Sequence, residues 1–434
     1  MALGGGTFTA QNKILPGAYI NFVSVAKASA LLSERGIAAV PFVLSWGRDD
    51  EIFSVTADDF NRHCPNIFGY ETSAPEMLPL REVFKNARIV LCYKLNKATA
   101  ASCTLATAKY GGKRGNDIKI IVTANADAPA KFDVSTVLGS EVMDKQTVAS
   151  AAGLIANAFV TFKADATLEA TAGLPLTGGT DGEVSGDAYQ TFLNKLESYS
   201  FHALACPSSD DATKKLFVSF TERMRDEVGA KFQLVGHNLT ANHEGVISIK
   251  NVCKGDGALE YGLVYWLTGA EAACAVNATC GNKAYTGEYE VNTDYTQQAL
   301  EDAVQAGALM FHSVDGEVHV LEDINTFTAY TATKGEDFSL NQVIRVLDQI
   351  ANDVAALFNK SYLDKVQNNA SGRASLWNDI VSYHTQLQTK GAIENFDSKN
   401  VSVEQGNQKR SVVLSETVQP VCAMEQLYMS VVVE

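Results

Sequence analysis

Short apolar runs of strand length alternate with amphipathic stretches of helix length along much of this 434-residue chain. The runs GIAAVPFVLS (36–45), RIVLCYKL (88–95) and FHALAC (201–206) are almost uninterrupted, which is typical of strands buried on both faces of a parallel sheet. Between them lie segments with apolar residues at helical spacing, such as 188–199. This alternation predicts an α/β fold with helices on both faces of the sheet.

Other elements follow from capping and turn signals. Thr56 is expected to cap a helix that has Asp58 and Asp59 in its first turn, where negative charge favours the helix dipole. Asp315-Gly316 is a hairpin signal, and Gly372 is expected to separate two helices. The remaining patterns predict helices over 79–86, 210–228, 257–277, 293–305 with Thr293 as cap, 340–362 and 373–389, and strands over 231–235, 246–252, 308–314 and 318–324.

Residues 97–182 differ in texture, because Ala, Thr and Gly dominate them. The pattern predicts a strand over 118–123 and a helix near 146–157, and turn residues cluster at 110–117 and 176–182. Since the α/β pattern resumes directly afterwards, we expect a small β-rich domain inserted into the α/β domain.

Both ends of the chain have the pattern of extended arms. Residues 1–25 begin with a glycine run and carry strand-like pieces on either side of Leu15-Pro16-Gly17, and 401–434 returns to β texture and closes with LYMSVVVE (427–434). A strand without a partner leaves its backbone groups unpaired. The last stretch therefore pairs either with a sheet of its own chain or with a neighbouring copy, and this pattern leaves both open.

Charge and composition exclude several classes of partner. The formal net charge is -15, which disfavours nucleic acid and anionic membrane surfaces. No apolar run approaches the roughly 20 residues of a membrane span, and the first residues lack the pattern of a signal peptide. The eight cysteines are scattered and form no CxxC pair, so we expect reduced, buried thiols in a protein folded in a cytoplasm.

The motifs of common catalytic sites are missing. The glycines around 111–115 and 255–257 lack the further residues of a Walker loop or a dinucleotide fingerprint, and are expected to be turns. The histidines form no HExxH pair. His237 and His243 flank a loop after a strand, where α/β sites often lie, but solvated side chains are the favoured interpretation. The sequence thus predicts no catalytic residue, no cofactor and no metal ligand.

Several stretches together resemble contractile bacteriophage tail sheath proteins, especially those of Gram-positive myophages and phage-tail-like bacteriocins. The stretches occur in the family's order over nearly the whole chain. They are GGGTFTAQNKILPGAYINFVS, RGIAAVPFVLSWG, YGGKRGNDIKI, LTGGTDG leading into DAYQTFLNKLESYSFHALACP, SLNQVIRVLDQI and RASLWNDIVSYHTQLQTKGAI.

The resemblance implies a subtilisin-like central α/β domain without protease activity, and no subtilase motif stands in this sequence. It implies a discontinuous sheath core at 26–96 and 183–330 and an outward-facing inserted domain at 97–182. A helical region at 331–400 is expected to face an inner tube. The arms at 1–25 and 401–434 are expected to add strands to neighbouring subunits.

The residues carrying these expectations fall into three groups. The strand arms comprise Thr7, Phe8, Tyr19, Ile20, Phe22, Leu427, Tyr428, Met429, Val431, Val432 and Val433. The candidate hinges are Gly4, Gly5, Gly6, Pro16, Gly17 and Gly406. Candidate charges toward the tube are Lys365, Arg373 and Lys390, for which a solvated helix face is an equal alternative.

The function implied by the resemblance is structural. Hexameric rings would stack into a helical tube around an inner tail tube protein, with baseplate and tail terminator proteins as further partners, and contraction would drive the tube through a bacterial envelope. The particle would be a virion tail or a bacteriocin, assembled in the host cytoplasm. A hydrolase on the same α/β domain and a binding module built on 97–182 are the competing hypotheses. The best acceptor for 427–433 is expected to be a sheet edge in the α/β body of an adjacent subunit.

Overall fold

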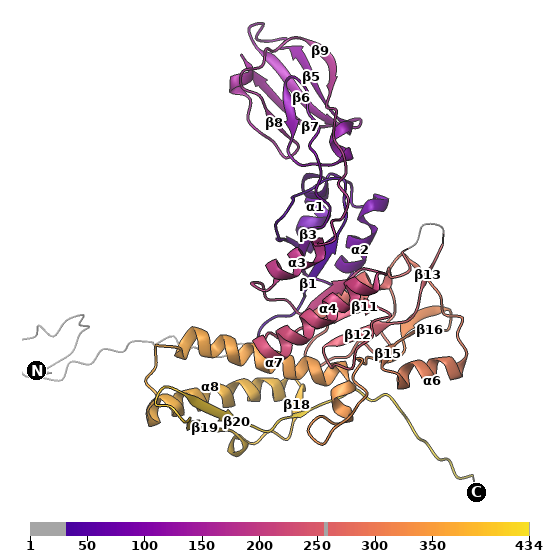
Figure 1. The fold of residues 1–434 in the computed structure, drawn as a ribbon, viewed down its shortest axis with the longest axis vertical. Coiled ribbons are helices and arrows are strands. Elements are labelled where there is room, and N and C mark those ends of the chain that lie inside the picture. Colours follow the sequence, from indigo (N-terminus) through magenta and orange to yellow (C-terminus); the bar gives the residue numbers. More distant parts are fainter. Residues whose placement is uncertain (1–31, 256–258, 434) are drawn as a thin grey trace, which may run out of the picture. The chain divides into compact units, whose positions relative to one another are not determined.

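The structure is a computed structural model that describes residues 32–255 and 259–433 (Figure 1). It divides into two compact units, which are treated separately here. The body unit contains 33–352, 390–394 and 419–434, and the helical unit contains 353–389 and 395–418. Some predicted residues lie outside the described part of the chain, namely Thr7, Phe8, Tyr19, Ile20, Phe22, Gly4, Gly5, Gly6, Pro16 and Gly17.

A seven-stranded sheet forms the centre of the body unit, in the order β15-β12-β11-β10-β1-β3-β2. Every pairing is parallel except that of the edge strand β2 with β3. The predicted α/β fold with a parallel sheet is therefore confirmed. The strands are β1 (Ile37–Phe42), β2 (Phe53–Thr56), β3 (Ile89–Lys94), β10 (Ala203–Cys206), β11 (Gln233–His237), β12 (Val246–Ile249) and β15 (Ala308–Leu309).

Side chains of each central strand alternate between two apolar cores. Val90 and Cys92 of β3 belong to the larger core, whereas Leu91 and Tyr93 belong to the core on the opposite face. Because successive side chains of a strand point to opposite faces, an uninterrupted apolar run is what a sheet covered on both sides requires. The larger core is covered by α1 (Ala57–Phe68), α2 (Leu78–Phe84) and α5 (Leu263–Ala273), and the other by α3 (Ala188–Leu196) and α4 (Asp211–Arg223).

Helix caps explain where these helices begin. Thr56 caps α1 as predicted, and its side chain forms a capping box with Asp59. For helix α6 (Gln297–Gln305) the predicted cap, Thr293, is wrong. The cap is Thr296, whose side chain accepts the backbone N–H of Ala299. Both threonines satisfy the capping preference, and only tertiary context distinguishes them. Helix α5 is shorter than the predicted 257–277, since its first turn begins at Leu263.

The strands before and after 97–182 join one sheet, and this intervening stretch forms an antiparallel assembly of its own (Figure 1). Ile118, Ile120 and Val122 alternate inward along β5. One sheet has the order β7-β6-β5-β9 and the other pairs β4 with β8. Their bounds are β4 (Ala106–Ala108), β5 (Ile118–Ala124), β6 (Phe132–Leu138), β7 (Glu141–Val148), β8 (Val160–Phe162) and β9 (Thr171–Pro175).

The predicted helix near 146–157 is wrong. Its first residues complete β7, and a single 3-10 turn at Ala151–Gly153 follows. Thr147 lies opposite Asp133 on β6 and donates a hydrogen bond to its Oδ1 over 2.6 Å. Pairing with β6 therefore outweighs the helical spacing of the apolar residues, and the β-branched Thr147 and Val148 suit a strand.

Short hairpins and pairs complete the strands. Asp315 and Gly316 both have positive φ, 51° and 89°, in the predicted hairpin between β16 and β17. This is the backbone geometry for which the Asp-Gly pair is favoured. The pairs are β13 (Cys253–Lys254) with β14 (Glu290–Val291), β16 (Phe311–Val314) with β17 (Glu317–Val320), β18 (Ile393–Glu394) with β21 (Gln419–Pro420), and β19 (Ser402–Gln405) with β20 (Val412–Ser415).

Helix α8 (Ala370–Thr389) and the β19–β20 hairpin dominate the helical unit, which α7 (Asn341–Leu357) enters with its last residues. Leu376, Ile380, Tyr383 and Leu387 form the buried stripe of α8. The predicted break at Gly372 is wrong, because α8 already begins at Ala370. A glycine in the first turn of a helix costs little, so it does not determine where the helix starts.

Candidate assembly site

The C-terminal segment, defined as residues 427–433, is the most exposed apolar stretch that the structure describes. The exposed fractions are 86% for Leu427, 89% for Tyr428, 71% for Val431 and 87% for Val432. The segment has no strand pairing among the described residues. The expectation that it is poorly packed in an isolated subunit is therefore confirmed, and its backbone N–H and C=O groups are available to another chain.

The root of this segment is held by the body unit. Strand β21 pairs with β18, and the N–H of Val421 donates to the carbonyl of Ala392 over 3.0 Å. The N–H of Ala423 donates to Oε1 of Gln342 on α7 over 3.0 Å. Beyond Ala423 the chain continues as a trace without helix or strand (Figure 1). The body therefore fixes where the segment starts and leaves its strand-forming residues uncovered.

Open sheet edges that could accept a strand differ in charge. The outer strand β7 carries Glu141, Asp144 and Lys145, and charged residues on an edge oppose pairing with another chain. The outer strand β20 (Val412–Ser415) carries no charge, and Val413 is 50% exposed. Of these two edges, only β20 has the uncharged and partly uncovered surface that an added strand needs.

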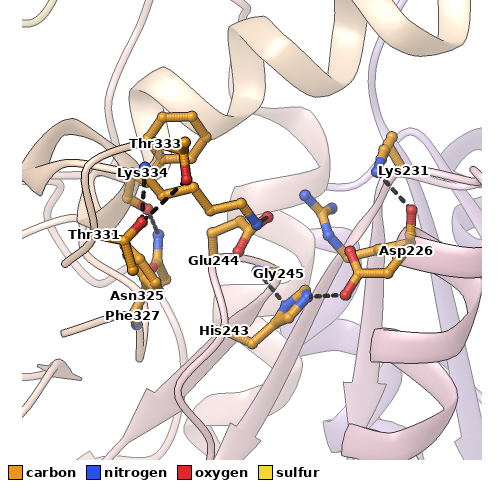
Figure 2. A network of polar contacts seen from close by, with 12 residues as sticks. Asp226, Lys231, His243, Glu244, Gly245, Asn325, Phe327, Thr331, Thr333 and Lys334 are labelled. Carbon is orange, nitrogen blue, oxygen red and sulfur yellow. Dashed lines mark hydrogen bonds and ion pairs between the residues drawn. The ribbon is translucent and has the colours of Figure 1, made fainter. Parts of the chain in front are cut away.

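Beneath the surface, a polar network surrounds His243 in the body unit (Figure 2). Its Nδ1 accepts the backbone N–H of Gly245 over 2.9 Å, and its Nε2 lies 3.2 Å from Oδ2 of Asp226. Nζ of Lys334 donates to Glu244 over 2.7 Å. This hydrogen bond lowers the pKa of Glu244 although burial acts in the opposite direction as the largest influence.

The acidic and imidazole atoms of Asp226, His243 and Glu244 lie within 4.8 Å of one another, as metal ligands would. Nδ1 of His243 already accepts a hydrogen bond, so the ring proton of the neutral imidazole lies on Nε2 and no lone pair is left for a metal. The carboxylate of Glu244 already forms an ion pair with Lys334. The side chains of this network therefore bond to one another and do not form a metal site. His237 and His243 are 4% and 7% exposed, which corrects the prediction that they are solvated.

A second buried group of charges surrounds Arg345 of α7. Its guanidinium lies 2.6 Å from Oε2 of Glu271 and 3.1 Å from Oδ2 of Asp323, and it also donates to the carbonyl of Ala278 over 2.6 Å. Glu271, Cys280 and Asp323 again place ligand-type atoms within 4.8 Å. Arg345 already supplies the positive charge that these carboxylates need, so the arrangement does not fit a metal ion.

Comparison with known proteins decides the family. Four domain families match consecutive parts of the chain: "Tail sheath protein Gp18 domain III N-terminal region" over 35–95, "Phage tail sheath protein beta-sandwich domain" over 96–181, "Phage tail sheath protein central domain" over 182–326 and "Phage tail sheath C-terminal domain" over 333–434. The chain belongs to the contractile phage tail sheath proteins.

Similar proteins cover nearly its whole length. The crystal structure of the sheath tail protein from Desulfitobacterium hafniense is 39% identical with a TM-score of 0.82, over 95% of this chain and 99% of that one. The sheath tail protein of Listeria innocua is 32% identical with a TM-score of 0.81, over 92% and 94%. The phage-like element PBSX protein XkdK of Bacillus subtilis is 33% identical over 99% of each chain.

Lys365, Arg373, Lys390 and Gly406 are the remaining described residues for which the sequence predicts a role in assembly. Lys365 is exposed, and Arg373 is half-buried and donates to Oδ1 of Asn368 over 3.0 Å in the helical unit. Lys390 is exposed and belongs to the body unit. Gly406 lies at the start of the β19–β20 turn, where its N–H donates to the carbonyl of Ser411 over 2.9 Å. The tube-facing and hinge roles of these residues stay predictions.

The buried ion pairs of this sheath protein were missed from the sequence, although a signal was present. Glu271 is the one acidic residue of α5, within LVYWLTGAEAA, and Arg345 interrupts the apolar run VIRVL. An isolated charge inside a buried helix face requires a partner of opposite charge. The pattern therefore indicated that partners exist, but it could not pair residues that lie 74 positions apart.

The described helices include none that is long and apolar enough to cross a bilayer.

Proposed function

We propose that this chain is the repeating subunit of a contractile sheath that stacks as hexameric rings around an inner tail tube protein. Its contraction drives the tube through a bacterial envelope, and baseplate and tail terminator proteins bind the ends of the sheath. The sheath forms in the host cytoplasm and acts in a virion tail or a bacteriocin particle. The exposed C-terminal segment (427–433) is the observation that carries this proposal, because it has strand-forming residues and no pairing partner among the described residues.

The α/β body would serve as the rigid part that rotates during contraction, as in a subtilisin-like core without protease function. Buried ion pairs such as Arg345 with Glu271 and Arg225 with Asp348 resist separation of the elements that they join. Breaking a buried pair by moving one partner away costs several kcal/mol, about 3–5. The body therefore repacks as one piece, while the uncovered segments change partners.

Strand addition suits a sheath that slides and stays connected. Backbone hydrogen bonds contribute about 0.5–1.5 kcal/mol each and do not depend on side-chain identity. A segment of this length forms several such bonds with each neighbour. Repeated over every subunit, these bonds form a mesh that remains intact while the bodies rotate.

The acceptor that we propose is β20 in the β19–β20 hairpin of a neighbouring subunit. The expected acceptor in the α/β body would be β2, its antiparallel edge strand. Phe53 and Val55 of β2 are already buried, at 7% and 2% exposure, so β2 has little apolar surface left to cover. Val413 of β20 is half-exposed and can pack against the valines of an incoming segment.

Negative-stain microscopy of the purified full-length chain tests the polymer. We expect long hollow tubes, and a monomer at high concentration in every salt tested would contradict the proposal. Deleting 427–434 should leave a folded monomer that forms no tubes, because Val421 and Ala423, which contact the body, are kept. Tubes from this truncated chain would show that the segment does not connect subunits.

A matched pair of substitutions tests the acceptor. Val413→Glu places a charge on β20 and should abolish tubes, whereas Ser54→Glu places the same charge on an exposed position of β2 and should leave them intact. The opposite result would assign the acceptor to the edge of the α/β body.

A further inference from the structure

A buried histidine of α8 faces a carboxylate at the end of β20, inside the helical unit. The side chain of His384 has no exposed surface, and its Nε2 lies 3.5 Å from Oε2 of Glu416. Glu416 is the first residue after β20, and 20% of its side chain is exposed. This contact therefore joins α8 to the edge strand that is proposed above as the acceptor.

The hydrogen bonds of His384 fix where its ring protons lie. Nδ1 lies 2.9 Å from the carbonyl oxygen of Ile380, one helical turn earlier. A carbonyl oxygen only accepts, so Nδ1 carries a hydrogen and donates it. In a neutral ring, Nε2 would then present a lone pair to the carboxylate of Glu416. Neither Nε2 nor Oε2 has a hydrogen-bond partner elsewhere among the described residues, and two buried acceptors that face each other repel. The contact therefore requires a proton between these two atoms.

Aromatic rings hold the imidazole in place. Phe396 stacks on His384 with ring centroids 5.1 Å apart, and Tyr383 meets it edge-on at 5.5 Å. The N–H of Phe396 donates to Oε1 of Gln388 over 2.7 Å, which fixes the stacked ring to α8. The imidazole is thus confined, whereas solvent reaches part of Glu416. The carboxylate is therefore the member of the pair that can move away.

Three acidic residues lie on the elements packed around His384. Glu416 follows β20, Asp353 of α7 accepts the hydroxyl of Tyr383 over 2.8 Å, and Glu404 of β19 is exposed. Burial acts to lower the pKa of His384, but the contact with Glu416 and the backbone hydrogen bond outweigh burial and raise this pKa. The charges of the surroundings thus favour the protonated ring, in agreement with the hydrogen-bond geometry.

We propose that His384 and Glu416 form a proton-dependent latch, which holds the end of β20 against α8 and keeps this edge able to accept a strand from a neighbouring copy. When Nε2 loses its proton, the two acceptors repel, and Glu416 moves out into water. The pairing of β20 with β19 ends at Ser415 and Ser402, directly beside Glu416, so the movement disturbs the edge. The latch deepens the function proposed above and rests on it for the effect on assembly.

Rising pH opens this latch. A histidine in the unfolded chain titrates near about pH 6.5, and the pKa of His384 in the folded chain is raised above that value. The pair therefore stabilises the helical unit fully below about pH 6.5, and this stabilisation is lost as pH rises through the folded pKa. Sheath assembly should accordingly weaken in alkaline solution.

The proton itself is tested in the full chain with Val432→Asp, a change at an exposed position of the C-terminal segment that should prevent assembly. The ring signals of isotope-labelled histidines are followed by NMR, in solution or, should tubes persist, in the sedimented tubes. We expect one of the seven histidines to titrate above about pH 6.5, and its midpoint to fall when Glu416→Gln is added. Titrations that Glu416→Gln leaves unchanged would overturn the latch, whatever microscopy shows.

Microscopy of the otherwise unchanged chain at about pH 6 and about pH 9 tests the consequence for assembly. The parent chain should lose its tubes at the higher pH. In Glu416→Gln the side-chain amide donates to the neutral Nε2, so the latch stays closed and tubes should persist at both pH values. His63→Asn is the matched control, because His63 is exposed, and it should keep the pH dependence of the parent.

The outcomes separate the latch from the sheath function. Tubes of the parent that persist at the higher pH, or tubes of Glu416→Gln that are lost there, would overturn the latch and leave the sheath function standing. No tubes at either pH in any of these chains would count against the sheath function, and the histidine titration would then decide on the latch alone.

Discussion

Two stretches of almost the same chemistry have opposite fates in this molecule. Strand β3, IVLCYK, and the C-terminal segment, LYMSVVV, are both β-branched and apolar. Val90 and Cys92 of β3 have no exposed surface, whereas Val432 and Val433 are 87% and 90% exposed. Intrinsic strand preference is therefore satisfied within the chain in one case and left unsatisfied in the other.

The difference lies in the partners that the fold provides. Strand β3 is hydrogen-bonded to β1 and β2, and helices cover both faces of the sheet. The C-terminal segment has no strand partner among the described residues and carries no charged residue before Glu434 that would discourage pairing. Edge strands are normally protected by charge or proline. This uncovered segment is the feature on which the proposed assembly rests.

The largest expected contrast comes from one substitution made in both stretches. Val90→Asp buries a carboxylate without a partner and should unfold the body, costing more than about 4 kcal/mol. Val432→Asp should change the free energy of unfolding by less than about 0.5 kcal/mol, because its site is exposed. Chemical denaturation measures both. Microscopy should show that Val432→Asp removes tubes, and unchanged tubes would mean that this segment is not an assembly strand.

The buried ion pair offers the next contrast between covered and uncovered positions. Arg345→Met leaves the carboxylates of Glu271 and Asp323 buried without their cation, and should lower the free energy of unfolding by about 3–5 kcal/mol. Arg62→Met is the control, since Arg62 and Asp58 are 71% and 65% exposed in their side chains. That pair should contribute about 0.5 kcal/mol or less. An equal loss in the free energy of unfolding for Arg345→Met and Arg62→Met would show that the buried ion pair stabilises the body no more than an exposed pair does.

A smaller effect tests how tightly the covered side is packed. A Cβ at Gly269 of α5 would lie 2.3 Å from the carbonyl oxygen of Val83 in α2. Gly269→Ala should therefore cost about 1–3 kcal/mol in thermal unfolding, despite the better helix propensity of alanine. Gly186→Ala is the matched control, because nothing lies within 4 Å of its added Cβ. A neutral Gly269→Ala would show that the two helices can move apart.

The smallest effect is a pH dependence confined to the body. Burial, with Arg35 nearby, lowers the pKa of His202 to about 3, and its Nδ1 accepts the N–H of Ile37 at the start of β1. Below about pH 6.5 the His202 imidazole binds a proton in the unfolded chain but stays neutral in the folded chain. The free energy of unfolding therefore falls as pH falls from about 6.5 toward 3.

At pH 5 this loss should be about 1–2 kcal/mol for a group that is not fully buried. His202→Asn keeps a hydrogen-bond acceptor near Ile37 and should flatten the dependence between pH 5 and 6.5, measured by denaturant midpoints. An unchanged slope in this variant would assign the dependence to other groups. The C-terminal segment contains no group that titrates in this range, so its exposure should not change with pH.

Some elements predicted from local sequence signals are confirmed by the structure, and others are wrong. Thr56 caps α1 and Asp315-Gly316 turns a hairpin, because each signal acts on its own neighbours. The helix predicted near 146–157 is wrong, because the opposing strand β6, and not local spacing, decides the state of Gln146 and Thr147. The solvated state predicted for His243 is wrong for the same kind of reason, since its partner Asp226 is brought to it by the tertiary fold.

The candidate assembly site also has features that the sequence determines and others that only the tertiary structure decides. The sequence alone determined the apolar strands and their order with the helices, since these depend on periodicity and side-chain type. It also predicts a strand over 427–433, which stays a prediction because the structure has no strand there. Only the tertiary structure decided which strands find partners inside the chain, and that Glu271, Asp323 and Arg345 share one buried site. Sequence spacing carries no information about contacts between distant residues, and it is packing that brings them together or, for the C-terminal segment, leaves it uncovered.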